Sequence, residues 1–242
     1  MQGSEISKKD SSITSELPFL ITASHELKAP LALMRQLALA LESDVTEEER
    51  TRMVRQIVLT SERALRLTTD LSRSARLEDS LFELEPISPY QICEEVAHEL
   101  TPLYKAKGRE IRVTSKYRSH LAVANRDLLY RIMLNFADNA LHYVEAKTPV
   151  ELRASTMSHK SQIRLGVRDY GPAVSSEMWR HLQMSLGTAS QTLHSRPQSS
   201  GLGLFIAGQF ARAMRGKIGA TRHHDGATFY VDLTASTQLS LL

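Results

Sequence analysis

Residues 24–30 read SHELKAP and place His25 directly beside Glu26. A neutral imidazole, whose unperturbed pKa is about 6.5, can act as a nucleophile while a carboxylate holds its second ring N–H. Such a pair could accept a phosphoryl group, because phosphoryl transfer depends mainly on positioning and on charge neutralisation. A surface histidine on an ordinary helix is the competing interpretation, so the pair has to be weighed together with the rest of the chain.

Two asparagines, Asn135 and Asn139, are one helical turn apart in the segment NFADNALHY, so their amides point the same way. A side-chain amide oxygen is a suitable ligand for Mg²⁺, which usually keeps some waters and shares substrate phosphates. Two polar residues at the solvated edge of a helix would give the same spacing. Taken alone, the pair leaves both interpretations open.

Two glycine-containing segments could complete a pocket for a phosphate or a nucleotide. Asp169 ends an expected strand just before Gly171, so its carboxylate is expected at the rim of a sheet where a turn begins. Gly201 and Gly203 precede another helical run, where the backbone can approach an anion closely and the N–H groups of a helix N-terminus can hold phosphate. An ordinary turn aspartate and a chance GLGL sequence are the simple alternatives.

The spacing of apolar residues predicts two long helices near the start of the chain. Apolar side chains recur every three or four positions over residues 14–42, and a second such stripe follows over residues 46–75. Thr46, with Glu49 three residues later, resembles a capping box at the start of the second helix. A single helical hairpin leaves apolar surface exposed, whereas two hairpins make a closed four-helix bundle, so we expect a homodimer through residues 14–80.

The rest of the chain alternates between helical and strand-like patterns, which predicts an α/β sandwich with helices on one side of a mixed sheet and an α+β class for the whole. The expected divisions are a polar lead-in at 1–13, the hairpin at 14–80, a linker at 81–88, the sandwich at 89–236 and a tail at 237–242. Helices are expected near 89–107, 125–144, 175–184 and 203–215, and strands near 109–115, 121–124, 150–157, 162–169, 217–222 and 227–233.

Composition limits the remaining classes of function. The formal charge of +3, from 30 basic and 27 acidic residues, is no nucleic-acid footprint, so no nucleic-acid partner is expected. The longest apolar run is far shorter than the roughly 20 residues that cross a bilayer, so this chain is expected to make no membrane contact, although a membrane sensor region could precede it. The single cysteine, Cys93, fits a reducing compartment, and we expect a cytoplasmic location.

Together, in this order, the SHELKAP hairpin, the asparagine-containing helix, the Asp-x-Gly turn and the GLGL helix resemble the sensor histidine kinases of two-component systems. The resemblance covers about residues 15–235. The hairpin is similar to their HisKA-type dimerisation and phosphoacceptor domain, and the sandwich to their ATP-binding domain of the Bergerat, or GHKL, type. It implies ATP and Mg²⁺ as cofactors, autophosphorylation, and phosphotransfer to an aspartate on the receiver domain of a response regulator.

The resemblance also implies roles for individual residues. His25 would be the phosphoacceptor and Glu26 its neighbouring base, while Asn139 would ligate magnesium. Asp169 matches the aspartate that accepts a hydrogen bond from the adenine amino group, and Arg196 is expected to contact the γ-phosphate. The other residues implied in nucleotide binding are Asn135, His142, Tyr143, Gly171, Gly201, Leu202, Gly203 and Leu204.

The chain departs from the family pattern at three positions. Ala173 and Ser199 stand where the two glycine motifs usually have glycine, so ATP turnover could be slow. Ala29 stands where a threonine or asparagine often helps to position the water that dephosphorylates the partner regulator. Alanine has no hydrogen-bonding side chain, so we expect weak phosphatase activity.

Two other functions remain open at this point. A catalytically weak kinase could serve as a dimeric scaffold that senses nucleotide and docks a regulator, and the altered glycine motifs favour that interpretation. An ATPase of the chaperone or topoisomerase kind would form no phosphohistidine, and it would leave the SHELKAP segment without a reason.

Overall fold

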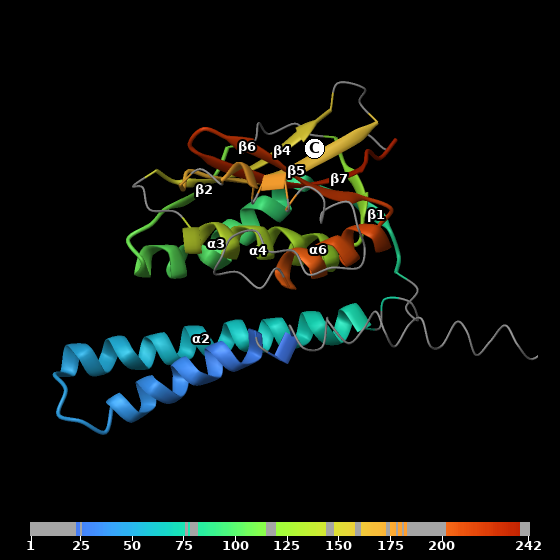
Figure 1. Ribbon diagram of the computed structural model, residues 1–242. Helices are drawn as coiled ribbons and strands as arrows, with labels where there is room; N and C mark the ends of the chain where they lie inside the picture. The colour runs from blue at the N-terminus through green and yellow to red at the C-terminus, as the bar shows by residue number, and fades with distance from the viewer. Residues whose placement is uncertain are drawn as a thin grey trace, which may run out of the picture.

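The computed structural model consists of a helical hairpin and an α/β sandwich packed against it (Figure 1). Charged contacts join the two parts. The structure describes residues 23–24, 26–75, 77, 82–114, 120–143, 148–157, 161–172, 175–177, 179–180, 182 and 202–237, the side chains of His142 and Tyr143 excepted.

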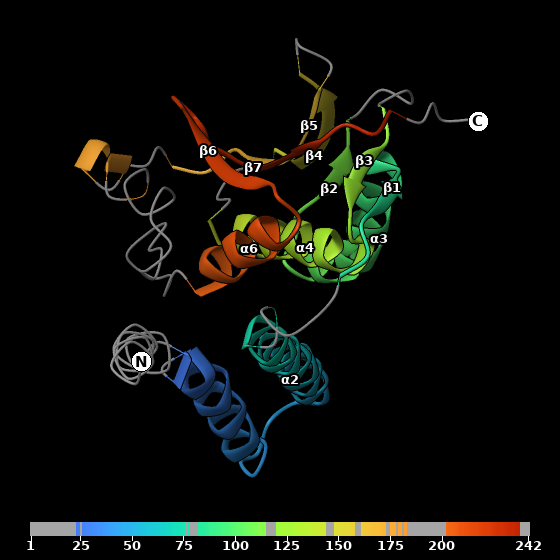
Figure 2. The ribbon, with the colours of Figure 1, turned by 90° about the vertical axis from the view of Figure 1, so that its right-hand side faces the viewer.

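The hairpin is made of a first helix, described over residues 26–40, and helix α2, Glu47–Ala75. The two run side by side in both ribbon views (Figures 1 and 2). At the start of α2 the backbone N–H of Thr46 donates to Oε2 of Glu49 over 3.1 Å, and the N–H of Glu49 donates to Oγ1 of Thr46 over 3.3 Å. The predicted capping box is therefore confirmed, and the backbone bond from Thr46 lowers the pKa of Glu49.

Thr46→Ala should lower the free energy of unfolding of the hairpin by about 1 kcal/mol, because α2 loses the side chain that accepts from its first turn. Thermal denaturation followed by circular dichroism measures the change. Thr60→Ala is the matched control, since the Thr60 hydroxyl only donates to the Gln56 carbonyl inside the helix. Equal losses in the two variants would show that Thr46 does not cap the helix.

A five-stranded mixed sheet forms the body of the sandwich, in the order β2-β4-β5-β7-β6. The pair β2–β4 is parallel and the other pairs are antiparallel. The strands are β2 Ile111–Val113, β4 Val150–Thr156, β5 Gln162–Asp169, β6 Lys217–His223 and β7 Gly226–Thr234. Helices α3 Pro89–Ala106, α4 Arg126–Tyr143 and α6 Leu202–Ala213 cover one face of the sheet (Figure 2).

The core lies between this sheet and its three helices. Alternate residues of β5, such as Leu165 and Val167, are buried against the helices, as expected for a strand with one covered face. The largest buried aromatic residues, Tyr104, Phe136 and Phe210, come one from each helix. The sequence pattern predicted these elements to within a few residues, and the predicted α+β class and mixed sheet are confirmed.

A second, two-stranded sheet differs from the sequence prediction. Strand β1, Glu85–Ile87, pairs antiparallel with β3, Ala122–Ala124, and Ile87 is buried. Residues 85–87 lie within the segment expected to be a linker. The strand was not predicted because three residues with Pro86 in the middle show no alternating pattern.

Among the described residues no helix combines the length and the apolar character of a membrane span.

Helix α2 is attached to α4, the helix that carries both asparagines. Asp70 of α2 and Arg131 of α4 form a buried ion pair, and Arg63 lies 3.1 Å from Asp138. Burial raises the pKa of Asp70, and the hydrogen bond from Arg131 only partly opposes this. The hairpin is thus attached to the sandwich through charged pairs on the same helix that could bind a nucleotide.

Candidate functional site

Asn139 and the GLGL helix come together where α4 packs on α6. The amide nitrogen of Asn139 lies 3.7 Å from the point that a Cβ on Gly203 would occupy. Leu202 and Leu204 are fully buried and fix the first turn of α6 in the core. The N-terminus of a helix attracts anions through its N–H groups and its dipole, so an amide beside it suits a phosphate group and its metal ion.

Asn135 lies one turn before Asn139 on α4 and has an unusual environment. Its Nδ2 atom is buried, and the described residues offer it no hydrogen-bond acceptor. Buried polar groups are almost always paired, and an unpaired one costs about 1–3 kcal/mol. An oxygen-rich ligand would supply the acceptor, and amide oxygens are ligands that Mg²⁺ accepts, so Asn135 and Asn139 fit a magnesium nucleotide.

Asp169 ends β5 with a buried and firmly oriented carboxylate. Its Oδ1 accepts hydrogen bonds from the backbone N–H groups of Gly171, at 3.2 Å, and of Ala227, at 3.3 Å. The buried Tyr104 of α3 is joined to α4, because its hydroxyl donates to the Ala137 carbonyl over 2.7 Å. Its pKa is raised, first by burial and then by the nearby charges, including that of Asp169. A fixed carboxylate at the sheet rim is suited to accept from an amino group of a ligand.

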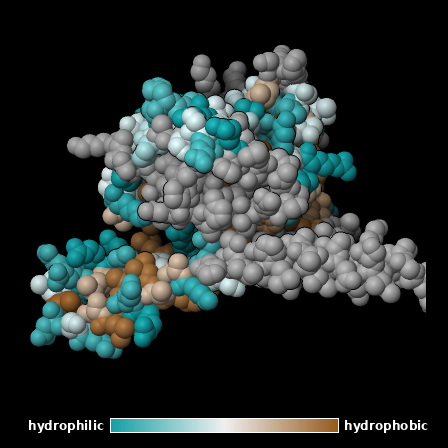
Figure 3. All heavy atoms as spheres, viewed as in Figure 1, coloured by the Kyte–Doolittle hydropathy of each residue, from teal (hydrophilic) through white to brown (hydrophobic). Residues whose placement is uncertain are grey.

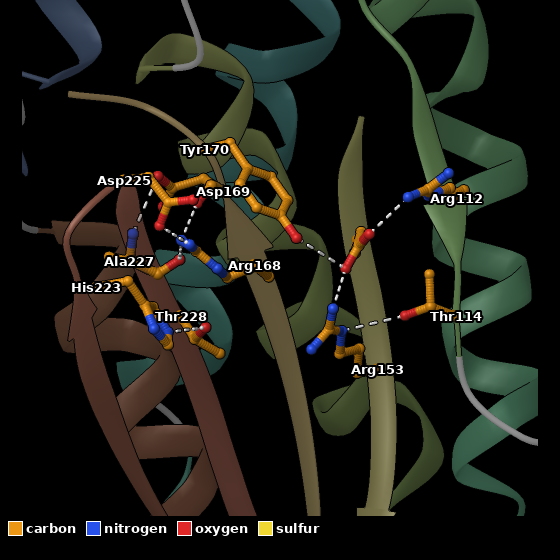
Figure 4. Close-up of polar contacts among 11 residues, drawn as sticks. Arg112, Thr114, Arg153, Arg168, Asp169, Tyr170, His223, Asp225, Ala227 and Thr228 are labelled. Atoms are coloured by element: carbon orange, nitrogen blue, oxygen red, sulfur yellow. Dashed lines mark hydrogen bonds and ion pairs between the residues drawn. The ribbon is translucent and has the colours of Figure 1, made fainter. Parts of the chain in front are cut away.

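Arg168 bonds to the backbone on either side of this carboxylate and to Asp225, as Figure 4 shows. Its guanidinium donates to the carbonyl of Asp169 and, over 3.4 Å, to the carbonyl of Ala227, and it forms an ion pair with Asp225. The guanidinium carbon also lies 4.3 Å from the centre of the Tyr170 ring. Partial burial would raise the pKa of Asp225, but the hydrogen bond and charge of Arg168 outweigh it, so the pKa is lowered.

Glu151 of β4 extends the network across the sheet to Arg112 and Arg153, which are labelled in Figure 4. It accepts from Arg112 at 2.7 Å, from Arg153, and from the Tyr170 hydroxyl at 3.3 Å. Burial alone would raise the pKa of Glu151, but the hydrogen bonds from the two arginines outweigh it and lower the pKa below its ordinary value of 4.5. The turn that follows Asp169 is thereby tied to β2 and β4.

Glu151→Gln should lower the free energy of unfolding at neutral pH by about 1–3 kcal/mol, because two arginines lose their shared carboxylate. A carboxylate with a lowered folded pKa stabilises the fold above its unfolded pKa, and this contribution is lost as the pH falls below 4.5. Urea denaturation at several pH values should therefore show that the free energy of unfolding falls less steeply toward acid pH in this variant than in the wild type. The exposed Glu177→Gln should follow the wild type, and equal slopes in all three proteins would contradict the role of Glu151.

Gly226, in the turn between β6 and β7, is a site residue that sequence reasoning did not single out. Its φ angle is +132°, and a Cβ there would meet the carbonyl of Asp169 and would lie 2.8 Å from Oδ1 of Asp169. Gly226 lies between the two strands that the sequence predicts near 217–222 and 227–233. Its contact with Asp169 could not be predicted, because the two segments are more than 50 residues apart.

Several expected site residues lie outside the described residues: His25, Ala173, Arg196, Ser199 and Gly201, together with the side chains of His142 and Tyr143. Glu26 is half-buried and Ala29 is exposed on the first helix. Gly171 is buried beside Asp169. The structure therefore brings Asn139 to the start of α6 and places Asp169 at the end of the neighbouring sheet.

Known proteins resemble the chain over nearly all its length. Residues 124–237 match the family described as Histidine kinase-, DNA gyrase B-, and HSP90-like ATPase. Over 215 residues the chain is 29% identical to the sensor protein CutS of Streptomyces coelicolor, an alignment that covers 88% of this chain and 51% of CutS. The chain thus spans about half the length of this curated relative.

Two solved structures extend the comparison to three dimensions. Full-length ShkA in complex with AMPPNP is 27% identical, with a TM-score of 0.60, and covers 93% of this chain and 47% of its own. The histidine kinase AdeS of Acinetobacter baumannii has the same TM-score of 0.60 at 16% identity, covers 88% of this chain and 98% of its own, and shows a shared fold. The chain therefore resembles sensor histidine kinases over most of its length, and its residues 124–237 match the histidine kinase-, DNA gyrase B- and HSP90-like ATPases.

Proposed function

We propose that the chain transfers the γ-phosphoryl group of ATP to His25 and then to an aspartate on the receiver domain of a response regulator. One observation carries this proposal: Asn139 meets Gly203 where α4 packs on α6, and one turn away the buried amide nitrogen of Asn135 has no acceptor among the described residues. A buried donor without an acceptor is costly, and a bound nucleotide would offset that cost.

The proposed chemistry consists of two displacements at phosphorus. A ring nitrogen of His25 attacks the γ-phosphorus, the bond to the bridging oxygen breaks, and ADP leaves with the electron pair. Glu26 is the adjacent carboxylate that can hold the other ring N–H. A carboxylate oxygen of the regulator then attacks the phosphorus, and the nitrogen–phosphorus bond breaks. Mg²⁺, held through Asn139, would neutralise phosphate charge when it is bound.

We also propose that the hairpin dimerises. Among the described residues its large exposed hydrophobic side chains are 36% to 67% accessible, and they are Leu31, Leu33, Leu39, Val54, Val58 and Leu65. Figure 3 shows hydrophobic surface along the hairpin, beside the more hydrophilic surface of the sandwich. A second copy of the hairpin would cover this surface as a four-helix bundle, which supports a homodimer.

Ala29→Thr should increase the rate at which the protein dephosphorylates its phosphorylated regulator by roughly tenfold or more, the size of effect that one positioned polar group can have. The exposed Ala29 offers no side chain that could hold the attacking water. Loss of label from a purified phosphoregulator measures the rate. Ala29→Val, which is similar in size to threonine but has no hydroxyl, is the matched control. A rate unchanged from the wild type in the Thr variant would remove the basis for the expected weak phosphatase activity.

Incubation of the purified chain with γ-labelled ATP and Mg²⁺ tests the proposed kinase activity. The expected result is an acid-labile, alkali-stable label on the protein that passes to an added receiver domain. Binding of ATP without any label would instead support a nucleotide-sensing scaffold. Release of labelled inorganic phosphate with no protein-bound label would indicate an ATPase.

A further inference from the structure

We propose that Arg168 is a positioning residue that fixes the carboxylate of Asp169 and so sets the preference for adenine, with Asp225 as its anchor. This inference rests on the proposed binding of ATP and names a determinant of base selectivity for that site. Nothing in the sequence motifs pointed to either residue, since both lie outside the motifs that the resemblance assigned.

The guanidinium of Arg168 lies at the end of the β5–β7 ladder and binds its last residue pair. Asp169 and Ala227 form the last residue pair of that ladder, and Arg168 donates to the carbonyl oxygens of both. The N–H of the same Ala227 donates to Oδ1 of Asp169. Arg168 therefore holds the backbone carbonyls of both Asp169 and Ala227. Because the N–H of Ala227 also donates to the Asp169 carboxylate, these contacts restrict rotation of that carboxylate.

Asp225 and Tyr170 keep the guanidinium in that position. The Arg168 side chain is only 7% exposed, whereas its ion-pair partner Asp225 is 41% exposed. A buried guanidinium is strongly destabilising when it loses its partner, so the turn that carries Asp225 is coupled to the placement of Arg168. The Tyr170 ring stacks on the guanidinium, and its hydroxyl reaches Glu151. The whole arrangement lies within one close-up view (Figure 4).

Strand β5 contains a second arginine, Arg164, which makes the same kinds of contact as Arg168 with a carboxylate and an aromatic ring but lies farther from Asp169 along the strand. Arg164 donates to Asp232 over 2.7 and 2.8 Å, and its guanidinium carbon lies 3.5 Å from the centre of the Tyr230 ring. Both arginines thus combine a carboxylate partner with an aromatic ring on the outer face of the sheet. Of these two arginines, only Arg168 bonds to the backbone of Asp169. Breaking the ion pair of Arg168 therefore tests a role in base selectivity, whereas breaking the ion pair of Arg164 tests the effect of stability alone.

The chemical consequence concerns the exocyclic group of the base. Adenine presents an amino donor to a carboxylate acceptor, whereas hypoxanthine presents a carbonyl oxygen at the same position, which a carboxylate repels. A firmly held carboxylate discriminates between the two bases, and a loosely held one can turn away from the carbonyl at little cost. Loosening Asp169 should therefore weaken the binding of ADP and leave the binding of IDP almost unchanged.

Isothermal titration of ADP and IDP into the full chain, in the presence of Mg²⁺, tests the inference. Asp225→Asn and Arg168→Lys should each lower the ADP-to-IDP affinity ratio by about tenfold, the loss expected for one charged hydrogen bond. Asp232→Asn, which breaks the matching pair, should lower the melting temperature and leave the ratio at the wild-type value. Because asparagine keeps a side-chain oxygen that can accept from Arg168, the Asp225→Asn variant is expected to fold even if the Arg168 variant does not.

The outcomes distinguish this inference from the proposed function. A wild-type protein that prefers ADP, with variants of Arg168 and Asp225 that keep the same ratio, would overturn the positioning role while leaving the kinase proposal intact. A ratio that falls equally in Asp232→Asn would also overturn it, because the effect would then follow from stability alone. A wild-type protein that binds neither nucleotide would refute the proposed function itself.

Discussion

Asn139→Ala should lower the rate of labelling from γ-labelled ATP by roughly 100-fold or more, the size of effect seen when a group that stabilises developing charge is removed. The amide of Asn139 lies beside the first turn of α6, where the phosphates of a nucleotide would meet the helix N-terminus. Its loss removes the proposed magnesium ligand, so both the affinity for magnesium nucleotide and the rate of the transfer step should fall. Autoradiography of the labelled protein over time gives the rate.

Asn125→Ala provides the matched control on the same helix. The side chain of Asn125 accepts from the N–H of Leu128 over 3.1 Å and caps the start of α4, away from Asn139. Its removal should cost about 1 kcal/mol of stability but leave labelling within a few-fold of the wild type. If Asn139→Ala labelled as fast as Asn125→Ala, the assignment of Asn139 as a magnesium ligand would be wrong.

Gly226→Ala should both destabilise the fold and abolish detectable binding of adenine nucleotides. A φ angle of +132° is a conformation that essentially only glycine adopts, and forcing another residue into it costs about 1–3 kcal/mol. The added Cβ would also meet the carbonyl of Asp169 and the guanidinium of Arg168, so the backbone of the turn would have to move. Because the same turn orients Asp169 through Ala227, the carboxylate proposed to bind the base moves with it.

Gly108→Ala is the matched control, because it introduces backbone strain at a glycine without displacing the residues around Asp169. Gly108 also has a positive φ angle, of +65°, but a Cβ there would meet nothing within 4 Å. It should therefore lose about 1–2 kcal/mol of stability and bind ADP like the wild type. Chemical denaturation and ADP titration of both variants give the comparison. Normal ADP affinity in a folded Gly226→Ala protein would show that the turn does not control Asp169.

Local sequence patterns predicted the elements and the main motifs because those signals lie within a few residues. The helical spacing of apolar residues located α3, α4 and α6, and the pair Thr46 and Glu49 marked the start of α2. Asn139 and Gly203 were expected in one site from their motifs, and the packing of α4 on α6 brings them together. Only strand β1 was absent from the expected pattern, because it is short and contains a proline.

The interactions that fix these motifs could not be predicted in the same way, since they join distant residues. The pair of Arg168 with Asp225 depends on the antiparallel register of β5 and β7, which places the β6–β7 turn beside the end of β5. The pair of Asp70 with Arg131 depends on how the hairpin docks on α4. In the sequence each of these residues is an ordinary charged residue on an element that is otherwise well predicted, so no local signal distinguishes it.

The docking of the hairpin bears directly on phosphotransfer. Asp70 and Arg131 join the hairpin to the helix that carries Asn135 and Asn139. In the proposed reaction the γ-phosphate must reach His25, so the relative placement of the two parts determines whether the reacting atoms can meet. The charged pairs on α4 are therefore part of the geometry on which the proposed reaction depends.

Identification of the phosphorylated side chain tests the central claim most directly. The purified chain is incubated with γ-labelled ATP and Mg²⁺, and wild type is compared with His25→Ala and with His98→Ala, which removes an exposed histidine on α3. The account predicts acid-labile label in the wild type and in His98→Ala, and none in His25→Ala although that variant still binds ATP. Label that persists in His25→Ala would contradict the account, because the phosphoryl group would then reside on another residue.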